Sequence, residues 1–167
     1  MLVLGGARSG KSRFAEALCS SPRTYIATAQ AFDDEMRDRI AQHKIQRGAA
    51  WNTIEAPADL VNAIAEHDVS EGTILVDCVT LWLSNLLLAE LDCLNAIEHL
   101  VSALKVSRGK IVLVSNEVGL SIVPDTKLGR AFRDIQGIAN QRIAAVAETV
   151  VFVAAGLPMV LKGRLPE

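Results

Sequence analysis

The chain opens with Met1-Leu-Val-Leu4, an apolar run, and continues as Gly5-Gly-Ala-Arg-Ser-Gly10-Lys11-Ser12 and then Arg13-Phe-Ala-Glu-Ala-Leu18. This order predicts a strand, a glycine-rich loop and a helix, and the loop matches the pattern G-x-x-x-x-G-K-[ST]. Glycines allow backbone conformations that other residues avoid, so successive N–H groups can point at one anion. The stretch therefore predicts a phosphate-binding loop (P-loop). The alternative is a glycine-rich turn that binds nothing.

The residues around the second half of the loop strengthen this interpretation. A helix that starts near Lys11 directs the positive end of its dipole toward the loop. The Lys11 side chain can reach the β- and γ-phosphates of a nucleotide, and the Ser12 hydroxyl can bind Mg²⁺.

The composition narrows the class of protein. The chain has 167 residues, half of them hydrophobic, and 17 Lys and Arg against 19 Asp and Glu give a net charge of −2. These values predict a single domain, residues 1–167, that buries a substantial core. We expect no nucleic-acid partner, because there is no basic excess, and no membrane span, because no apolar run approaches about 20 residues. We expect no signal peptide, because the apolar run Met1–Leu4 is too short for one.

The cysteines indicate the compartment. Cys19, Cys78 and Cys93 are an odd number, lack C-x-x-C spacing and lie in apolar contexts. We expect buried free thiols in a reducing cytoplasm.

Strand and helix patterns alternate along most of the chain. Strands are expected at Tyr25–Thr28, Trp51–Glu55, Thr73–Asp77, Lys110–Ser115 and Val150–Ala154, with a hairpin to Leu157–Leu161. Helices are expected at Asp33–Arg47, from Pro57 onward, and at Leu81–Leu91, Leu94–Val106 and Leu128–Glu148. One helix is expected to turn Leu60, Val61, Ile64 and Ala65 inward, and the last helix is expected to carry Phe132, Ile135, Ile138 and Ala139 on one side. The predicted fold class is α/β, a P-loop NTPase-type three-layer sandwich with a mainly parallel central sheet.

Asp77 is the second residue with a clear chemical expectation. It ends the apolar run Thr73-Ile-Leu-Val-Asp77. A carboxylate at the end of a neighbouring strand is the usual second anchor for the Mg²⁺ of a P-loop. The alternative is that Asp77 caps a helix that begins at Thr80.

The sequence leaves two roles open for His43, a structural one and a catalytic one. It shares a predicted helical face with Ile40, and this spacing favours a partly buried core histidine over a catalytic one. Its neighbours Arg39, Lys44 and Arg47 would disfavour the imidazolium, and a neutral imidazole is a nucleophile. These cations could equally form a solvated basic face.

Other polar residues are expected at the ends of strands. In an open α/β sheet the ligand crevice lies at the carboxyl ends of the strands. Glu55, Asp77, Asn116 and Glu117 would all lie there. Each could instead be a cap or a turn residue, and spacing does not assign their individual roles.

Several blocks of sequence go beyond a generic P-loop. In order along the chain they are Gly5–Ser12, Tyr25–Thr28, Asp34-Glu-Met36 with Arg39-Ile40 and His43-Lys44, Trp51–Thr53 with Glu55, Val114–Gly119 with Ile122–Pro124, and Phe132–Ile135 with Gly137 and Asn140-Gln141. Together these blocks resemble the bifunctional adenosylcobinamide kinase / adenosylcobinamide-phosphate guanylyltransferase family of cobalamin biosynthesis. The resemblance covers nearly the whole chain, and the blocks around His43 and after Val114 are its most specific parts.

The resemblance implies two reactions at one nucleotide site. In the first, ATP or GTP phosphorylates the hydroxyl of the aminopropanol arm of adenosylcobinamide, a corrinoid. In the second, GTP guanylylates a histidine and releases pyrophosphate, and the GMP then passes to adenosylcobinamide phosphate to give adenosylcobinamide-GDP.

The resemblance also implies roles for residues. It assigns the nucleophile to His43 and makes Lys11 catalytic, with Mg²⁺ on Ser12 and Asp77, and it implies a homotrimer. The implied nucleotide-binding positions are Gly5, Gly6, Ala7, Arg8, Ser9, Gly10, Lys11, Ser12, Ala27, Thr28, Ala29, Lys44, Ile45, Gln46, Arg47, Glu55 and Asp77.

Two other functions fit the motifs. A small-metabolite P-loop kinase without nucleotidyl transfer would leave His43 structural. A nucleotide-binding switch or ATPase module would need residues that position an attacking water, and no convincing pair is present.

Overall fold

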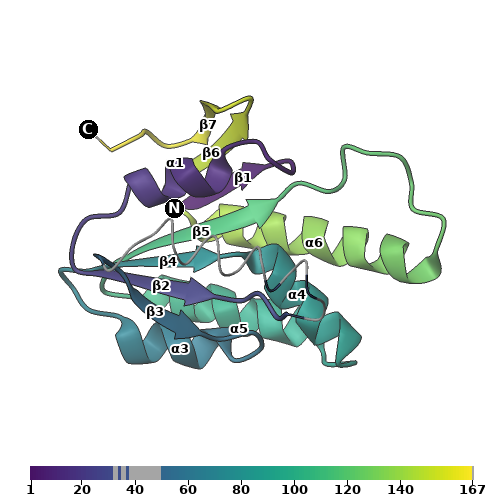
Figure 1. The fold of residues 1–167 in the computed structure, drawn as a ribbon, viewed down its shortest axis with the longest axis horizontal. Helices are drawn as coiled ribbons and strands as arrows, with labels where there is room; N and C mark the ends of the chain where they lie inside the picture. Colours follow the sequence, from purple (N-terminus) through teal and green to yellow (C-terminus); the bar gives the residue numbers. More distant parts are fainter. Residues whose placement is uncertain (32–33, 35–36, 38–49, 167) are drawn as a thin grey trace.

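The computed structural model describes residues 1–31, 34, 37 and 50–166, and its centre is a seven-stranded sheet. The strand order is β3-β2-β4-β5-β1-β6-β7 (Figure 1). All neighbours pair in parallel except β6 and β7, which form an antiparallel hairpin. The strands are β1 Leu2–Gly5, β2 Arg23–Ala27, β3 Asn52–Glu55, β4 Thr73–Asp77, β5 Lys110–Asn116, β6 Val150–Ala154 and β7 Leu157–Lys162.

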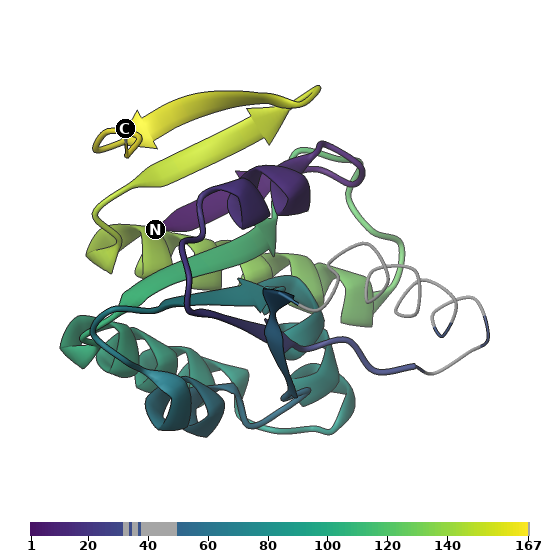
Figure 2. The same ribbon diagram turned by 60° about the vertical axis from the view of Figure 1, so that its left-hand side comes forward.

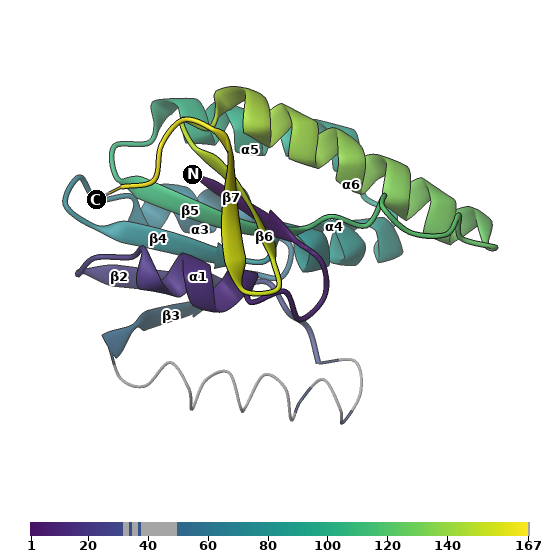
Figure 3. The same ribbon diagram turned by 90° about the horizontal axis from the view of Figure 1, so that it is seen from above.

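Helices cover both faces of the sheet. They are α1 Lys11–Ala17, α3 Leu60–His67, α4 Val79–Leu88, α5 Cys93–Val106 and α6 Lys127–Val146. α1 packs on one face, and α3, α4, α5 and α6 pack on the other (Figures 2 and 3). This arrangement confirms the predicted three-layer α/β fold.

The alternation of side chains along each strand explains why both faces are buried. In β1, Leu2 and Leu4 join the larger cluster with the four helices, whereas Val3 joins the smaller cluster under α1. The same division separates Ile74 from Leu75 in β4. Because successive side chains of a strand point to opposite faces, a strand covered on both sides must be apolar throughout. This is why the strands appear in the sequence as continuous apolar runs.

The expected strands are confirmed, with shifts at their ends. β2 runs from Arg23 to Ala27, two residues earlier at its start than expected, since Arg23 pairs with Thr73 of β4. β4 and β6 match the expected ranges, and the hairpin to β7 is present.

The predicted helix boundaries differ more from the structure than the predicted strand boundaries do. Pro57 does not open a helix, because α3 begins at Leu60 after Asp59. α4 ends at Leu88 rather than Leu91, and Glu90 then adopts a φ of 55°, a left-handed conformation that a helix cannot continue through. α6 begins after Thr126, whose Oγ1 accepts a hydrogen bond from the Gly129 N–H.

One predicted core position was wrong, and one residue on the apolar side of α6 is exposed. Ala65 is exposed, and Ala63 is buried in its place. Ile138 is 37% exposed, whereas the polar residues Gln136 and Asn140 of the same helix are buried. The apolar residues of α6 do not by themselves define its buried face, because that face also carries a polar cluster, described below.

The predicted helix at 33–47 lies outside the described residues, except for Asp34 and Arg37. The predicted site residues His43, Lys44, Ile45, Gln46 and Arg47 are therefore also outside them. Among the residues that the structure does describe, no helix has both the length and the apolar character needed to cross a membrane.

The three cysteines are buried free thiols, as expected. Burial raises the pKa of Cys19 to about 11 and that of Cys78 to about 12, and it also raises the pKa of Cys93. The folded protein therefore keeps these protons at a pH where the unfolded chain, with its ordinary thiol pKa of 9.0, has released them.

We predict that the free energy of unfolding decreases as the pH rises from about 9 to 11, because only the unfolded chain then loses thiol protons. Chemical denaturation across this range measures the effect. Cys78→Ser is a matched control, since a serine hydroxyl can still cap α4 but does not titrate there. Rapid reaction of all three thiols with a maleimide in the native state at pH 8 would contradict their burial.

Candidate nucleotide site

The P-loop connects β1 to α1 at the carboxyl edge of the sheet. Gly10 is the cap residue of α1 and has a φ of 92°, a left-handed conformation that favours glycine. The Phe14 N–H donates to the Gly10 carbonyl at 3.0 Å, which closes the first turn of the helix. Arg8 also has a positive φ, of 54°, although it carries a side chain. The loop therefore has the sharply turned backbone that the motif predicted.

The glycines of the loop have different roles. A Cβ on Gly5 would lie 2.5 Å from Ser9 Oγ and 2.7 Å from the Val153 carbonyl oxygen, so no larger residue fits. A Cβ on Gly6 would meet nothing within 4 Å, and Gly6 does not have a positive φ. Of the loop glycines Gly5, Gly6 and Gly10, only Gly10 has a positive φ, so the backbone freedom expected of these glycines is used at Gly10 alone.

Neighbouring segments hold the loop in place. The Glu117 N–H, just after β5, donates to the Gly5 carbonyl at 3.2 Å. The Gly156 N–H, in the β6–β7 turn, donates to the Ser9 carbonyl at 2.8 Å. Both contacts come from residues more than a hundred positions further along the chain, so the sheet positions the loop.

Two polar side chains of the loop differ in their contacts. Lys11 Nζ donates to the Gly6 carbonyl at 3.1 Å, which folds the ammonium group back over the loop. Ser9 Oγ is buried and has no hydrogen-bond partner among the described residues. An anion seated on the loop would lie beside the ammonium group.

Asp77 ends β4 and does not cap α4. Its Oδ2 accepts a hydrogen bond from the Tyr25 hydroxyl at 2.8 Å. The cap of α4 is Cys78, whose Sγ accepts from the Leu81 N–H. The alternative role for Asp77 as a helix cap is therefore ruled out by the structure.

The donor set at the end of β4 fits Mg²⁺. Magnesium prefers hard oxygen ligands and usually keeps several waters and phosphate oxygens, so one carboxylate and one hydroxyl are enough protein ligands. Asp77 supplies a half-buried carboxylate and Ser12, in the first turn of α1, supplies a hydroxyl. The described residues contain no cluster of three or more His, Cys, Asp or Glu side chains.

The sheet register brings other predicted residues together. Ala27, at the end of β2, pairs with Glu55 of β3 on one side and with Asp77 of β4 on the other. Ala29 lies just beyond β2 and is partly exposed. Glu55, Ala27 and Asp77 thus lie side by side at the edge that also carries the P-loop.

Thr28 has a different environment from its neighbours. It is fully buried, and its hydroxyl donates to the Cys78 carbonyl at 2.7 Å and accepts from the Cys78 N–H at 2.8 Å. Its own N–H donates to the Asp77 carbonyl, and its carbonyl accepts from Asn85 Nδ2. We interpret Thr28 as a residue that positions the ends of β2 and β4, because all its polar groups have protein partners.

Sequence reasoning missed a buried polar cluster behind the site. Asn140 Oδ1 accepts from Ser115 Oγ at 2.7 Å and from Gln136 Nε2 at 3.0 Å. Asn140 Nδ2 donates to the Asn116 carbonyl at 3.1 Å. A possible signal was the pair of amide residues four positions apart on the inner face of the α6 pattern.

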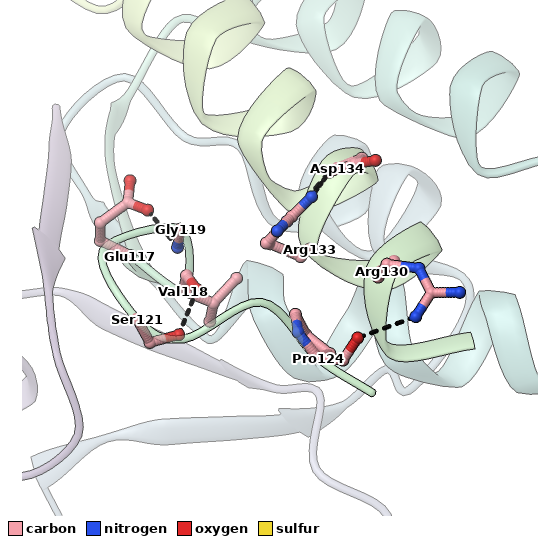
Figure 4. A network of polar contacts seen from close by, with 8 residues as sticks. All are labelled: Glu117, Val118, Gly119, Ser121, Pro124, Arg130, Arg133 and Asp134. Carbon is pink, nitrogen blue, oxygen red and sulfur yellow. Dashed lines mark hydrogen bonds and ion pairs between the residues drawn. The ribbon is translucent and has the colours of Figure 1, made fainter. Parts of the chain in front are cut away.

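The loop from β5 to α6 leaves the same edge of the sheet (Figure 4). Glu117 Oε1 accepts from the Gly119 N–H at 2.6 Å, so Glu117 stabilises the turn that follows it. Arg130 donates to the Pro124 carbonyl at 2.9 Å and anchors the far end of the loop to α6. Between these anchors, Leu120 and Ile122 are strongly exposed.

Comparison with known proteins identifies the family. The family model for cobinamide kinase / cobinamide phosphate guanyltransferase matches residues 1–161. The chain belongs to this family. Members carry both a kinase and a guanylyltransferase activity, so the chain is an enzyme of cobalamin biosynthesis and the resemblance inferred from its sequence blocks is confirmed.

The relatives match nearly the full chain. "Bifunctional adenosylcobalamin biosynthesis protein CobP" of Pseudomonas aeruginosa is 48% identical over 170 residues, covering 98% of this chain and 97% of that protein. "Bifunctional adenosylcobalamin biosynthesis protein CobU" of Salmonella typhimurium is 42% identical over 179 residues, covering 97% and 99%. Among solved structures, the flagellar accessory protein FlaH from Methanocaldococcus jannaschii aligns with a TM-score of 0.48 at 16% identity, over 98% of this chain and 77% of that one.

We predict opposite outcomes for two alanine substitutions in the P-loop. Gly5→Ala should lower the free energy of unfolding by about 1–3 kcal/mol and disturb the loop, because the new methyl group would overlap Ser9 and Val153. Gly6→Ala should be close to neutral for folding, because its methyl group would enter open space. Denaturant titration of the two variants checks this, and equal destabilisation would contradict the described loop.

Proposed function

We propose that one nucleotide site at the carboxyl edge of the sheet serves both activities of this enzyme, and that its corrinoid substrate is adenosylcobinamide. The observation that carries this proposal is the convergence of the P-loop, Glu55 and Asp77 on that edge. The P-loop binds the phosphates of ATP or GTP. Neighbouring strand ends, including Ala27, Ala29 and Glu55, bind the rest of the nucleotide.

In the kinase reaction, the hydroxyl of the aminopropanol arm attacks the γ-phosphorus of the nucleotide. The bond between the γ-phosphorus and the bridging oxygen breaks, a proton leaves the hydroxyl, and the nucleoside diphosphate departs. Lys11 and the loop N–H groups stabilise the negative charge on the phosphates. Mg²⁺, held by Ser12 and Asp77, supplies further charge neutralisation when it is bound.

In the guanylyltransferase reaction, a ring nitrogen of His43 attacks the α-phosphorus of GTP. A nitrogen–phosphorus bond forms as pyrophosphate leaves, and the Lys11 ammonium group compensates the charge of the leaving group. A phosphate oxygen of adenosylcobinamide phosphate then attacks the same phosphorus and releases His43. A covalent intermediate of this kind divides one transfer into two displacements and gives ping-pong kinetics.

The segment around His43 completes the proposed site. We assign His43 as the nucleophile and Lys44, Ile45, Gln46 and Arg47 as nucleotide contacts on the strength of the family resemblance. The two cations of this segment, Lys44 and Arg47, would attract phosphates and favour a neutral His43.

Labelling of the protein tests the histidine step. Purified protein is incubated with Mg²⁺ and α-labelled GTP, denatured, and examined for acid-labile label on the chain. We predict label on the parent protein, none on His43→Ala, and unchanged label on His99→Ala, a matched control because His99 is exposed on α5.

The alternatives give different results in the same experiment. Label on His43→Ala equal to the parent would remove His43 as the nucleophile. Phosphorylation of adenosylcobinamide without any labelled protein would indicate a kinase that lacks nucleotidyl transfer. Slow GTP hydrolysis without use of a corrinoid would indicate a switch module.

We also propose a homotrimer in the cytoplasm. The family resemblance supports the trimer, and exposed apolar residues, among them Leu120 and Ile122, are candidates for a subunit contact. The buried free thiols are typical of a reducing compartment. Light scattering should give a mass about three times the 17.9 kDa of one chain. A mass of 17.9 kDa at micromolar concentration would contradict the trimer.

A further inference from the structure

Asn116 occupies a central position that the nucleotide-binding assignments do not include. It is the last residue of β5, the strand that lies between β1 and β4 (Figure 1). In the sheet register it pairs with Gly5, where the P-loop begins. On the other side of β5, Asp77 pairs with Val114, two residues before Asn116. Asn116 is therefore placed between the phosphate-binding loop and the carboxylate proposed to hold Mg²⁺.

The backbone of Asn116 is held from both sides. Its N–H donates to Thr80 Oγ1 at 2.8 Å, and its carbonyl accepts from Asn140 Nδ2 at 3.1 Å. The orientation of the Asn140 amide follows from its partners, since its oxygen accepts from two donors, Ser115 Oγ and Gln136 Nε2. A buried polar cluster of this kind orders the end of β5 before any ligand binds.

The side chain of Asn116, in contrast, has no partner among the described residues. Its Oδ1 is buried and has no hydrogen-bond partner, and its Nδ2 makes no hydrogen bond with a residue that the structure describes. The amide of Asn85, another residue near this edge, donates to two carbonyl groups. Buried polar groups are nearly always hydrogen-bonded, so an ordered amide without a partner beside a ligand site indicates a partner supplied by the ligand.

We propose that the side-chain amide of Asn116 donates a hydrogen bond to the γ-phosphate of a bound nucleoside triphosphate. The inference rests on the proposed nucleotide site. Phosphate oxygens only accept hydrogen bonds, and the amide can present its N–H₂ group to them by rotating about its last bond. The γ-phosphate is the one expected between the P-loop and Asp77, because the P-loop lysine reaches the terminal phosphates and a Mg²⁺ held by Asp77 would neutralise their charge.

The contact would have different consequences in the two reactions. In the kinase step the terminal phosphoryl group is transferred, so the hydrogen bond acts on the reacting group and affects kcat. In the guanylyltransferase step the same phosphate leaves as part of pyrophosphate, and the contact contributes mainly to binding of GTP. Loss of the amide should therefore reduce kcat of phosphorylation by about tenfold, the effect expected for one hydrogen bond to a charged group.

Equilibrium binding separates this role from a structural one. We would measure the affinity of the parent protein, with Mg²⁺, for a non-hydrolysable GTP analogue and for GDP, and repeat both measurements on Asn116→Ala and Asn116→Asp. Asn116→Ala should bind the triphosphate analogue about tenfold more weakly and bind GDP as the parent does. Asn116→Asp should lose more affinity for the triphosphate analogue than Asn116→Ala does, because its carboxylate has the shape of the amide but repels phosphate.

A control variant and a folding check accompany these binding measurements. Asn95→Ala removes an exposed asparagine side chain on α5 and should bind both nucleotides like the parent. Thermal unfolding confirms that each variant is folded, and Asn116→Ser replaces the alanine variant if that variant fails to fold.

The possible failures are distinct. If the parent binds neither nucleotide, the proposed site itself is wrong. If the parent binds both and Asn116→Ala loses triphosphate and diphosphate affinity equally, or loses neither, the contact with the terminal phosphate is refuted. If Asn116→Asp binds the triphosphate as well as the parent, the amide is not a donor to phosphate.

Discussion

The parallel pairing of β1 between β5 and β6 is the constraint on which the site depends. It holds Gly5 against Asn116 on one side and Val153 on the other, so the strand can turn into the P-loop only where no Cβ is present. Backbone hydrogen bonds from Glu117 and Gly156 then fix the loop to both neighbouring strands. A phosphate-binding loop must present a rigid set of N–H groups, and this sheet supplies the rigidity.

The edge of the sheet brings together groups from segments that are distant in the chain. Ala27, Glu55 and Asp77 are neighbours only because β2 pairs with both β3 and β4. Behind them, the fully buried Thr28 links the ends of β2 and β4 through the backbone of Cys78. Residues proposed for the site and the supporting Thr28 therefore lie together at the carboxyl ends of the strands, where the crevice of an open α/β sheet is expected.

A second support comes from α6, the long helix after the exposed loop. Its inner face is not uniformly apolar, because Gln136 and Asn140 form hydrogen bonds with the end of β5. The Asn140 amide is paired at both ends and holds the Asn116 carbonyl, whereas the Gln136 amide is paired only through its nitrogen, because its Oε1 has no partner among the described residues. The fold thus orders the centre of the site from the strand side and from the helix side.

The sequence by itself determined the fold class, the P-loop, the position of Asp77 at a strand end and the family. These features are local: a glycine pattern, continuous apolar runs and specific blocks each report on adjacent residues. Tertiary structure alone decided that Cys78 rather than Asp77 caps α4, that Gly5 is sterically required while Gly6 is not, and that Gln136 and Asn140 are buried where Ile138 is exposed. These outcomes depend on which distant strand or helix lies beside each residue, and no local pattern in the chain encodes that neighbour.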